Sequence, residues 1–398
     1  MRILVVSPEI PFPPVGGGQL RTYHLVRALA TRHDVTFVGF TYDSTPESAP
    51  FPLQVVCVPW EWPDLYRQMY YGDAISSQRA SERLANKIDE PWFVSCLQSP
   101  PMEETLRRVA RDGFDLALIE HTNMARFLPA LPRNTPKVLD LVDVHTLMAQ
   151  RTAESKSGNE KVEASREADR TLRFERAVAS QCTLCLTCSG LEAFAVRRWL
   201  GTENVLAIPN GVDTSFFAPT EDRPTSGYLL FTGRMDYEPN IESVQYFGTE
   251  MLPLIRREIP EAKLHIVGAN PTAEVNRLIS ESVTVHGYVP DMRPYFRSAE
   301  VVVVPLLCGG GTRVKVLEAA ASGKAIVSTP LGVEGLEFSH GEDLVVAQSG
   351  SDFAGAVIAL ARDQARRRQL GRRARQASLQ YDWDTIGTRL CALLESLV

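Results

Sequence analysis

The 398-residue sequence lacks an apolar run of membrane-spanning length and lacks an excess of basic residues. A helix that crosses a bilayer needs about 20 consecutive apolar residues, so an integral membrane protein is not expected. The 42 Lys and Arg residues are outnumbered by 48 Asp and Glu residues, which gives a formal net charge of −6. General nucleic-acid binding requires a basic face and is not expected either. The opening MRILVVSPEIPFPP has only a short apolar run before its prolines, which predicts a first strand rather than a signal peptide and favours a cytoplasmic location.

Recognisable metal motifs are also scarce. Cys182, Cys185 and Cys188 form two successive C-x-x-C spacings among seven cysteines, and such spacings occur in metal and cluster sites. Apolar and small residues alternate through TLCLTCSG as in a buried strand, however, and no further Cys or His lies close by. Asp140 and Asp143, the nearest approach to a metal-binding Asp-x-Asp motif, fall in a predicted strand. We therefore predict buried free thiols and no metal site.

Short apolar runs alternate with helical patterns, which is typical of parallel sheets built from βαβ units. Strands are predicted in the first half at residues 2–6, 35–40, 53–58, 115–120, 137–143, 183–189 and 204–209. FFAPTEDRPTSG interrupts the pattern as a linker would, and strands then resume at 228–233, 263–268, 283–287, 301–307 and 325–329. Helical patterns include residues 150–180 and 241–259.

Two such sets predict an α/β protein with two doubly wound, Rossmann-like parallel-sheet domains that face a cleft. In these sheets ligands bind beyond the carboxyl ends of the strands. We place the domains at residues 1–215 and 222–380, followed by a last helix at 381–398.

CGGGTRVKVLE, from Cys308 to Glu318, follows a strand that is apolar on both faces and is therefore predicted to lie inside a parallel sheet. Glycines let backbone N–H groups approach an anion, and a helix predicted to begin near Thr312 adds its positive end. Arg313 and Lys315 add charge, and Glu318 could accept hydrogen bonds from a sugar diol. The three glycines are Gly309, Gly310 and Gly311. The motif indicates a nucleotide sugar or sugar phosphate as ligand; the alternative is a tight loop before a solvated helix.

Two further glycine motifs follow predicted strands. FTGRM places Gly233 and Arg234 at a carboxyl end, where an arginine can contact a phosphate at two points. VGGG, at residues 15–18, follows the first strand behind a Pro-rich loop. It does not meet the dinucleotide fingerprint G-x-G-x-x-G. That mismatch counts against an NAD-dependent oxidoreductase and favours a glycine loop that faces the cleft.

Two histidines follow strand ends in the first half. His121 comes directly after DLALIE, and His145 follows KVLDLVDV, with Asp143 two residues before it. Polar loop groups at this edge of a sheet are disproportionately functional, so each could position the acceptor or the sugar; each could instead be a satisfied loop histidine. His24 and His286 are expected to be structural.

Two segments leave alternatives open. ARDQARRRQLGRRARQ, at residues 361–376, predicts a strongly basic helix. It could make a peripheral contact with anionic lipid, but a solvated helix fits the acidic chain better. VPWEWPDLYRQMYY, at residues 58–71, concentrates aromatic side chains, which could stack on an acceptor or pack within a long loop.

In their order along the chain, these motifs resemble those of glycosyltransferase family 4, whose members have the GT-B fold. The resemblance rests on PPVGGGQLRTYHLVRAL, IPNGVD, FTGRM, GYVPDMRPYFRSAEVVVVPL and GGGTRVKVLEAAASGKAIVSTPLGVEGL. It implies transfer of a sugar, with retention, from a nucleotide sugar such as a UDP- or GDP-sugar to a glycan, lipid-linked or small-molecule acceptor. The first domain would bind the acceptor and the second the donor. A sugar-nucleotide epimerase and a non-catalytic nucleotide-sugar-binding protein are the alternatives.

The resemblance also implies roles for single residues. Glu318 would hold the ribose hydroxyls, Arg234 would meet the donor phosphates, and His121 would lie near the transferred sugar. The residues implied to form the glycine loop near the phosphates and the base pocket are Gly16, Gly17, Tyr288 and Val289.

The chain departs from the family pattern at two points. The first Glu of the Glu-x7-Glu pattern falls at Gly310, where backbone N–H groups of residues 310–312 could take over part of its role. The Lys that usually follows the Arg of FTGRM is missing, and Lys315 or Arg313 could supply that charge. Fixed cations and N–H dipoles stabilise a departing diphosphate, so we predict Arg234 and Lys315 as catalytic groups beside His121, with no metal or other cofactor required.

Overall fold

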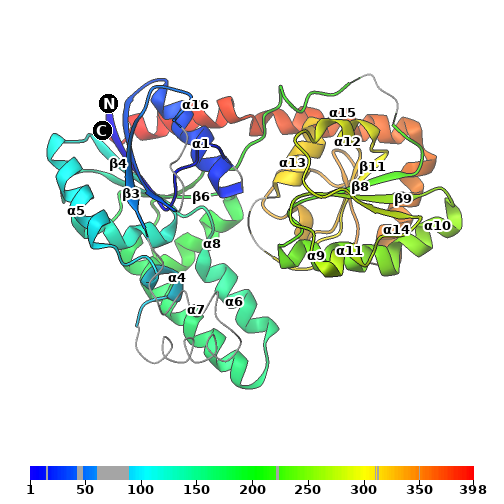
Figure 1. The fold of residues 1–398 in the computed structure, drawn as a ribbon, viewed down its shortest axis with the longest axis horizontal. Coiled ribbons are helices and arrows are strands. Elements are labelled where there is room, and N and C mark those ends of the chain that lie inside the picture. The colour runs from blue at the N-terminus through cyan, green and yellow to red at the C-terminus, as the bar shows by residue number, and fades with distance from the viewer. Residues whose placement is uncertain are drawn as a thin grey trace. The chain divides into compact units, whose positions relative to one another are not determined.

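The computed structural model describes residues 1–14, 17–42, 48–60, 89–220, 224–309, 311, 313–348 and 350–398. The chain forms two compact units. One contains Met1–Pro209 together with Gly387–Val398, and the other contains Asn210–Ile386. Each unit consists of a parallel sheet with helices packed on it (Figure 1).

The first unit contains a seven-stranded sheet in the order β3-β2-β1-β4-β5-β6-β7. The strands are β1 (Arg2–Ser7), β2 (Asp34–Thr41), β3 (Gln54–Pro59), β4 (Leu116–Glu120), β5 (Lys137–Asp140), β6 (Leu184–Thr187) and β7 (Val205–Ala207). The strand order reverses between β1 and β4, which are hydrogen-bonded neighbours. Their carboxyl ends therefore form the topological switch point at which ligands of open α/β sheets bind.

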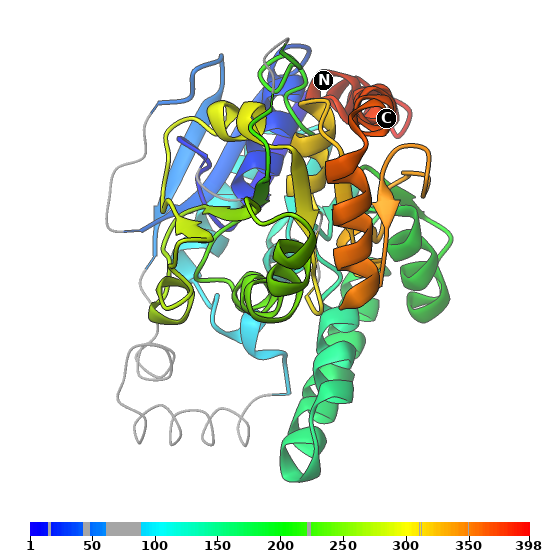
Figure 2. The ribbon, with the colours of Figure 1, turned by 90° about the vertical axis from the view of Figure 1, so that its right-hand side faces the viewer.

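The helices of the first unit begin and end at recognisable residues. They are α1 (Gly17–Ala30), α4 (Trp92–Ser95), α5 (Pro100–Val109), α6 (His145–Ser155), α7 (Gly158–Ala179) and α8 (Gly190–Leu200), with 3₁₀ turns η1 (Ala110–Asp112) and η2 (Thr122–Ala130). Ser189 caps α8 by accepting a hydrogen bond from the Glu192 N–H, and its hydroxyl donates to the Glu192 carboxylate. Gly201, in the left-handed conformation, ends the helix. Helices α6 and α7 form a hairpin that extends away from the sheet (Figures 1 and 2).

The second unit contains a six-stranded sheet in the order β10-β9-β8-β11-β12-β13. Its strands are β8 (Tyr228–Thr232), β9 (Lys263–Val267), β10 (Val283–Val285), β11 (Val301–Val304), β12 (Ile326–Ser328) and β13 (Val345–Val346). The order again reverses, here between β8 and β11, where Leu230 lies opposite Val302. A second switch point therefore exists at the carboxyl ends of these two strands.

The helices of the second unit pack on both faces of this sheet. They are α9 (Glu238–Tyr246), α10 (Leu252–Glu258), α11 (Ala273–Asn276), α12 (Arg293–Ser298), α13 (Val314–Ala321), α14 (Ser351–Arg362) and α15 (Gln364–Ser378), with short turns η3 (Phe247–Met251), η4 (Leu331–Val333) and η5 (Leu379–Tyr381). The last helix, α16 (Trp383–Glu395), begins in the second unit and lies mostly in the first. Val301 and Val303 contribute to the core under α9, α10 and α14, whereas Val302 and Val304 contribute to the core under α12, α13 and α15. A continuous apolar run is what a strand buried on both faces requires.

The predicted fold class is confirmed in both units, with differences in detail. The short strand β13 was not predicted, and the helix predicted at 241–259 is divided by the π-helical turn η3. The compact units change at Pro209/Asn210 and Ile386/Gly387, a few residues from the predicted domain limits at 215–222 and 380/381. Two hydrogen bonds join Val212 to the second unit. The Val212 N–H donates to the Tyr381 carbonyl (2.9 Å), and the Trp383 N–H donates to the Val212 carbonyl (3.3 Å).

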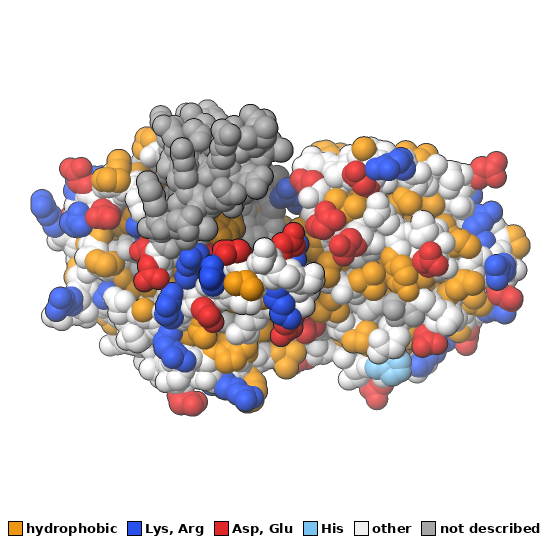
Figure 3. Space-filling view, turned by 90° about the horizontal axis from the view of Figure 1, so that it is seen from below, with side chains coloured by type: hydrophobic (Ala, Val, Ile, Leu, Met, Phe, Trp, Pro, Cys, Tyr) orange, Lys and Arg blue, Asp and Glu red, His pale blue; other side chains and the backbone are white. Residues whose placement is uncertain are grey.

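The basic helix predicted at 361–376 corresponds mainly to α15, and many of its arginines bind within the protein. Arg367 forms a buried ion pair with Glu300 at 2.8 Å, and Arg375 donates to the carbonyls of Thr214 and Ala321. Viewed from below, acidic and basic side chains are interspersed on the surface (Figure 3). Within the described residues, no helix has the length and apolar character needed to cross a bilayer. Lipid contact by α15 stays a prediction.

Candidate active site

The two anion-binding motifs predicted in the second half meet at the switch point of the second sheet. Gly233 directly follows β8, and Lys315 lies in the first turn of α13, after the loop that follows β11. The Lys315 amine (Nζ) donates a 2.6 Å hydrogen bond to Asn240 Oδ1. A Cβ atom added to Gly233 would lie only 3.0 Å from Lys315 Nζ and 2.8 Å from Asn240 Nδ2. Only a glycine leaves room for this amine beside the end of β8.

The glycine loop after β11 has the backbone geometry that its sequence predicts. Gly309 and Gly311 have φ values of 100° and 78°, which residues with a Cβ rarely adopt. The buried Arg313 side chain donates to the carbonyls of Gly309 (3.1 Å) and Leu331 (3.0 Å), so its guanidinium holds the loop in place. Direct ligand contact by Arg313 stays a prediction. The predicted contact residues Gly310 and Thr312 lie outside the described residues.

Helix α13 begins at Val314, slightly later than predicted, and no side chain among the described residues caps its first turn. The first N–H groups of a helix generally have no partner within it; here the Val316 N–H donates to the Arg313 carbonyl at 2.8 Å. Burial lowers the pKa of Lys315 to about 7, and burial raises the pKa of Glu318 to about 7. Within the described residues the Glu318 carboxylate makes no hydrogen bond, so its oxygens remain available as acceptors.

Arg234 lies at the same edge in an exposed position and pairs with a residue that the sequence did not reveal. Its Nε donates to Asp236 Oδ1 at 3.0 Å and its Nη2 to Asp236 Oδ2 at 2.7 Å. Asn270 donates a further hydrogen bond to Asp236 at 2.9 Å. The Arg234 hydrogen bonds are the main reason that the pKa of Asp236 falls to about 2. The arginine side chain is 61% exposed, so it can contact a ligand while Asp236 orients it.

The residues implied to line a base pocket occupy different surroundings. Tyr288 is 76% exposed, whereas Val289 is partly buried against the core under α12 and α13. His286 lies close by, and its Nε2 is 3.0 Å from His265 Nδ1. Tyr228 stacks on His265 with a centroid separation of 3.6 Å. These contacts agree with a structural role for His286.

His121 lies at the switch point of the first sheet, directly after β4. Its backbone has φ = 67° and its N–H donates to the Asp140 carbonyl at 2.8 Å. A Cβ atom added to Gly18 would lie 3.5 Å from His121 Cε1, so the imidazole lies against the start of α1. Burial lowers the pKa of His121, and the acids Asp143 and Asp140 oppose that shift. Gly17 is the first residue of α1, and Gly16 lies outside the described residues.

Backbone strain is concentrated at this edge of the first sheet. Val142, two residues after β5, also has a positive φ, at 60°. A positive φ in a β-branched residue is a genuine outlier, and strained backbone of this kind clusters at active and ligand-binding sites. The strain at His121 and Val142 supports a functional site here.

Beneath His121 lies a buried charged cluster that the sequence alone did not reveal. Arg21 of α1 binds Asp140 of β5 through Nε (2.8 Å) and Nη2 (3.1 Å), and its Nη1 donates to the Ile208 carbonyl (2.9 Å). Burial raises the pKa of the neighbouring Glu120 to about 8, with a further contribution from Asp140. The only hint in the sequence is that acids end two apolar strands, DLALIE and KVLD.

His145 begins α6 and is held there from two sides. Its backbone N–H donates to the Glu175 carboxylate at 3.1 Å, which caps the helix. Its ring stacks on Phe93 with centroids 4.0 Å apart, and burial lowers the pKa of His145 to about 4, against the charge of Asp143. The imidazole is therefore neutral at physiological pH.

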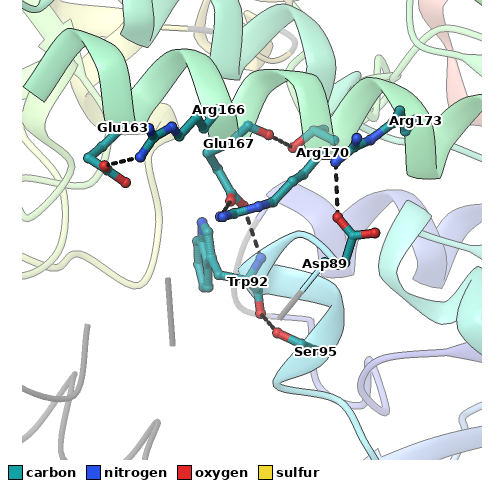
Figure 4. Close-up of polar contacts among 9 residues, drawn as sticks. Asp89, Trp92, Ser95, Glu163, Arg166, Glu167, Arg170 and Arg173 are labelled. Atoms are coloured by element: carbon teal, nitrogen blue, oxygen red, sulfur yellow. Dashed lines mark hydrogen bonds and ion pairs between the residues drawn. The ribbon is translucent and has the colours of Figure 1, made fainter. Parts of the chain in front are cut away.

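The segment at Asp89–Ser95, which contains Phe93, is bonded to α7 at Asp89 and Trp92 (Figure 4). The Trp92 N–H donates to Glu167 Oε1 at 2.9 Å, and Arg173 pairs with Asp89 at 3.1 Å. Asp143 is partly buried two residues before His145. An acceptor-side role for either residue stays a prediction. Of the aromatic segment at 58–71, residues 61–71 lie outside the described residues.

The described residues contain no group of three or more His, Cys, Asp or Glu side chains arranged to hold a metal ion. Cys182, Cys185 and Cys188 are free thiols. Cys188 donates to the Val142 carbonyl at 2.9 Å, and burial raises the pKa of Cys185 to about 12. These thiols pack in and around β6 as the alternation of the strand predicts.

In comparisons with known proteins, the two halves of the chain match two different sequence profiles. The sequence profile of Glycosyltransferase Family 4 matches residues 15–216, and that of Glycosyl transferases group 1 matches residues 226–363. The chain is 28% identical to the phosphatidyl-myo-inositol mannosyltransferase of Mycolicibacterium smegmatis over 216 residues, which cover 50% of this chain and 55% of that protein. The chain spans about half the length of the curated relatives that it matches.

Solved structures match over the whole chain. Sucrose-phosphate synthase from Thermosynechococcus elongatus has a TM-score of 0.72 at 19% identity, over 100% of this chain and 99% of that chain. HepE from Anabaena, in complex with UDP, has a TM-score of 0.68 at 15% identity, over 100% of both chains. The two parallel-sheet units are thus those of the GT-B fold. The chain belongs to glycosyltransferase family 4.

Proposed function

We propose that the protein is a glycosyltransferase that moves a sugar from a nucleotide-sugar donor to an acceptor, with retention of anomeric configuration. The observation that carries the proposal is the convergence of Lys315, Gly233 and the glycine loop at the switch point of the second sheet. The Glu318 carboxylate lies close enough to interact with the charge of Lys315. Ligands of such sheets bind at this position. HepE, which shares the fold, has been solved with UDP and with UDP-glucose, and this supports a nucleotide sugar as donor.

The chemistry of the site suits a diphosphate leaving group. As the glycosidic bond breaks, negative charge builds up on the phosphate oxygens, and fixed cations and N–H dipoles stabilise it most in the transition state. Lys315, Arg234 and the first N–H groups of α13 supply that positive charge. Glu318 accepts hydrogen bonds from the ribose hydroxyls. Because protein groups balance the diphosphate charge, we propose that transfer needs no metal ion.

The first unit contributes the sugar and acceptor contacts in this proposal. The imidazole of His121 lies at its switch point beside Gly18, and a neutral ring there can donate one hydrogen bond and accept another. His145 and Asp143 follow the neighbouring strand β5. We propose that these polar groups orient hydroxyl groups of the transferred sugar and of the acceptor, which is a glycan, a lipid-linked sugar or a small molecule.

A panel of UDP-, GDP-, ADP- and dTDP-sugars tests the donor. At a hundredfold excess over its dissociation constant a ligand stabilises the native state by about 2.7 kcal/mol, which raises the melting temperature measurably. The stabilising donor is then incubated with candidate acceptors, and release of the nucleoside diphosphate is followed with and without EDTA. NMR of the product gives the anomeric configuration.

Several outcomes would contradict the proposal. A flat thermal response to all four donor classes would refute it. Conversion of the donor without release of a nucleoside diphosphate would indicate an epimerase, and binding without any turnover across a broad acceptor panel would indicate a non-catalytic binding protein. A Glu318→Ala variant should lose most of the thermal response, whereas Glu274→Ala, an exposed acid at the start of α11, serves as the matched control.

A further inference from the structure

Asn240 connects the two motifs of the candidate phosphate site. It lies in the first turn of α9, is 6% exposed, and uses both ends of its amide. Its Oδ1 accepts the hydrogen bond from Lys315 Nζ at 2.6 Å, and its Nδ2 donates to the Arg234 carbonyl at 2.8 Å. One neutral side chain therefore fixes the lysine and the backbone of the arginine loop in relation to each other.

Lys315 is partly buried, and its amine uses only part of its hydrogen-bonding capacity. Its Nζ lies 4.1 Å from the centroid of the Phe231 ring, and its one hydrogen bond to a described residue is that to Asn240. An ammonium group has three N–H donors. Among the described residues no carboxylate lies within ion-pair distance of this amine. A group that is buried without a counter-charge favours its neutral form.

We propose that Asn240 is a positioning residue that holds Lys315 beside Gly233, and that the Lys315 amine takes up one proton from solvent when a nucleoside diphosphate binds. This inference rests on the proposed function. The diphosphate adds negative charge beside the amine, and an opposite charge within about 4–6 Å favours the ammonium form. The proton adds a third N–H donor, so two N–H groups can bind phosphate oxygens while the remaining one stays bonded to Asn240.

The direction of the proton transfer follows from the groups that act on Lys315. Burial and the charge of Arg313 lower its pKa to about 7, and Glu318 opposes them. At pH 8 the amine of the free protein is therefore mostly neutral, and that of the complex is protonated. Nucleotide affinity falls as the pH rises above 7, by up to about tenfold per pH unit. Glu318, with a pKa of about 7, is largely ionised at pH 8 and remains so when it accepts ribose hydroxyls.

Calorimetry of the full chain at pH 8 measures this proton directly. UDP, or whichever of UDP, GDP, ADP and dTDP binds most tightly, is titrated in HEPES and in Tris, whose ionisation enthalpies differ. We expect uptake of about 0.9 proton per nucleotide, the neutral fraction of an amine with a pKa near 7. Lys315→Met should bind more weakly, take up almost no proton and lose the pH dependence. Nucleotide binding without proton uptake, or equal proton uptake by Lys315→Met, would overturn this inference but would leave the proposed function unaffected.

Substitutions at Asn240 test its positioning role. Asn240→Leu keeps the shape but removes both hydrogen bonds, and we expect at least a tenfold loss of nucleotide affinity; Asn276→Leu, at an exposed asparagine, is the control. Asn240→Asp gives the amine a permanent counter-charge, so proton uptake on nucleotide binding at pH 8 should fall towards zero. This variant still tests the role of Asn240 if Asn240→Leu does not fold. Unchanged affinity in a folded Asn240→Leu protein, or full uptake in Asn240→Asp, would contradict the role. If no nucleotide binds the wild type at any pH, the proposed function fails as well.

Discussion

Replacing Glu120 by Gln should change the pH dependence of stability in a defined direction. Glu120 ends β4 immediately before His121 and is 1% exposed. Neither carboxyl oxygen makes a hydrogen bond of good geometry within the described residues, although Thr22 and Ser7 lie near enough to oppose the shift in its pKa. Burial and the charge of Asp140 raise this pKa to about 8, so the carboxyl is protonated in the folded protein at neutral pH.

Proton linkage gives the sign and the size of this change in the free energy of unfolding. The unfolded carboxyl has an ordinary pKa near 4.5, so unfolding between pH 4.5 and 8 releases a proton. The free energy of unfolding therefore falls as the pH rises through this window. Linkage gives a loss of about 1 kcal/mol by pH 5 and about 4 kcal/mol by pH 7.5. Glu120→Gln cannot release that proton, so its stability relative to the wild type should rise by about 3 kcal/mol between pH 5 and pH 7.5.

Urea unfolding of both proteins at pH 5 and pH 7.5, followed by circular dichroism, measures this difference. The cost of burying the amide is the same at both pH values and cancels, as do the other titrating groups of the chain. If the stability difference between the two proteins were the same at both pH values, Glu120 would have to be ionised in the folded protein. The argument for a neutral carboxyl beneath His121 would then be wrong.

Three further substitutions test the two units. Arg234→Ala should lower the release of nucleoside diphosphate at least about tenfold, because a charge-assisted phosphate contact contributes roughly 1.5–3 kcal/mol; a near-normal rate would mean that the phosphates bind elsewhere. Asp140→Asn leaves Arg21 buried without its counter-charge and should cost about 3–5 kcal/mol in urea unfolding, and a loss below about 1 kcal/mol would contradict the buried ion pair. Gly309→Ala, at φ = 100°, should lower the melting temperature, whereas Gly355→Ala in the exposed face of α14 should raise it slightly; equal effects would contradict the loop geometry.

Much of the fold could be predicted because buried parallel strands have a direct signature in sequence. A strand with helices on both faces must be apolar at every position, and the run at 301–304 is buried at all four residues. The same logic explains the miss at β13, because a partly buried strand of two residues leaves no pattern to detect. The pairing of Val212 with residues 381–383 joins segments that are distant in the chain, so no local pattern shows where the second compact unit begins.

The site could be predicted only where its residues follow a strand directly. His121, Gly233 and the glycine loop could be proposed from the sequence because the carboxyl ends of strands mark the ligand edge of such sheets. Asp140 pairs with Arg21 across 119 residues, and Asn240 accepts from Lys315 across 75 residues. No local pattern identifies such partners. A neutral asparagine in a first helical turn is an ordinary helix residue until the fold brings a buried amine to it.

The position of Lys315 also explains how the chain can depart from the pattern of its family. The lysine that usually follows the Arg of FTGRM is absent, and Asn240 lies in the segment where it is expected. Strands β8 and β11 are neighbours, so the loop after either strand can deliver an amine to the same point beside Gly233. What the chemistry requires is positive charge at the carboxyl end of β8, and not a lysine at one position in the sequence. Asn240 accepts the hydrogen bond from this amine of α13, and in our proposal the asparagine and the lysine therefore act together.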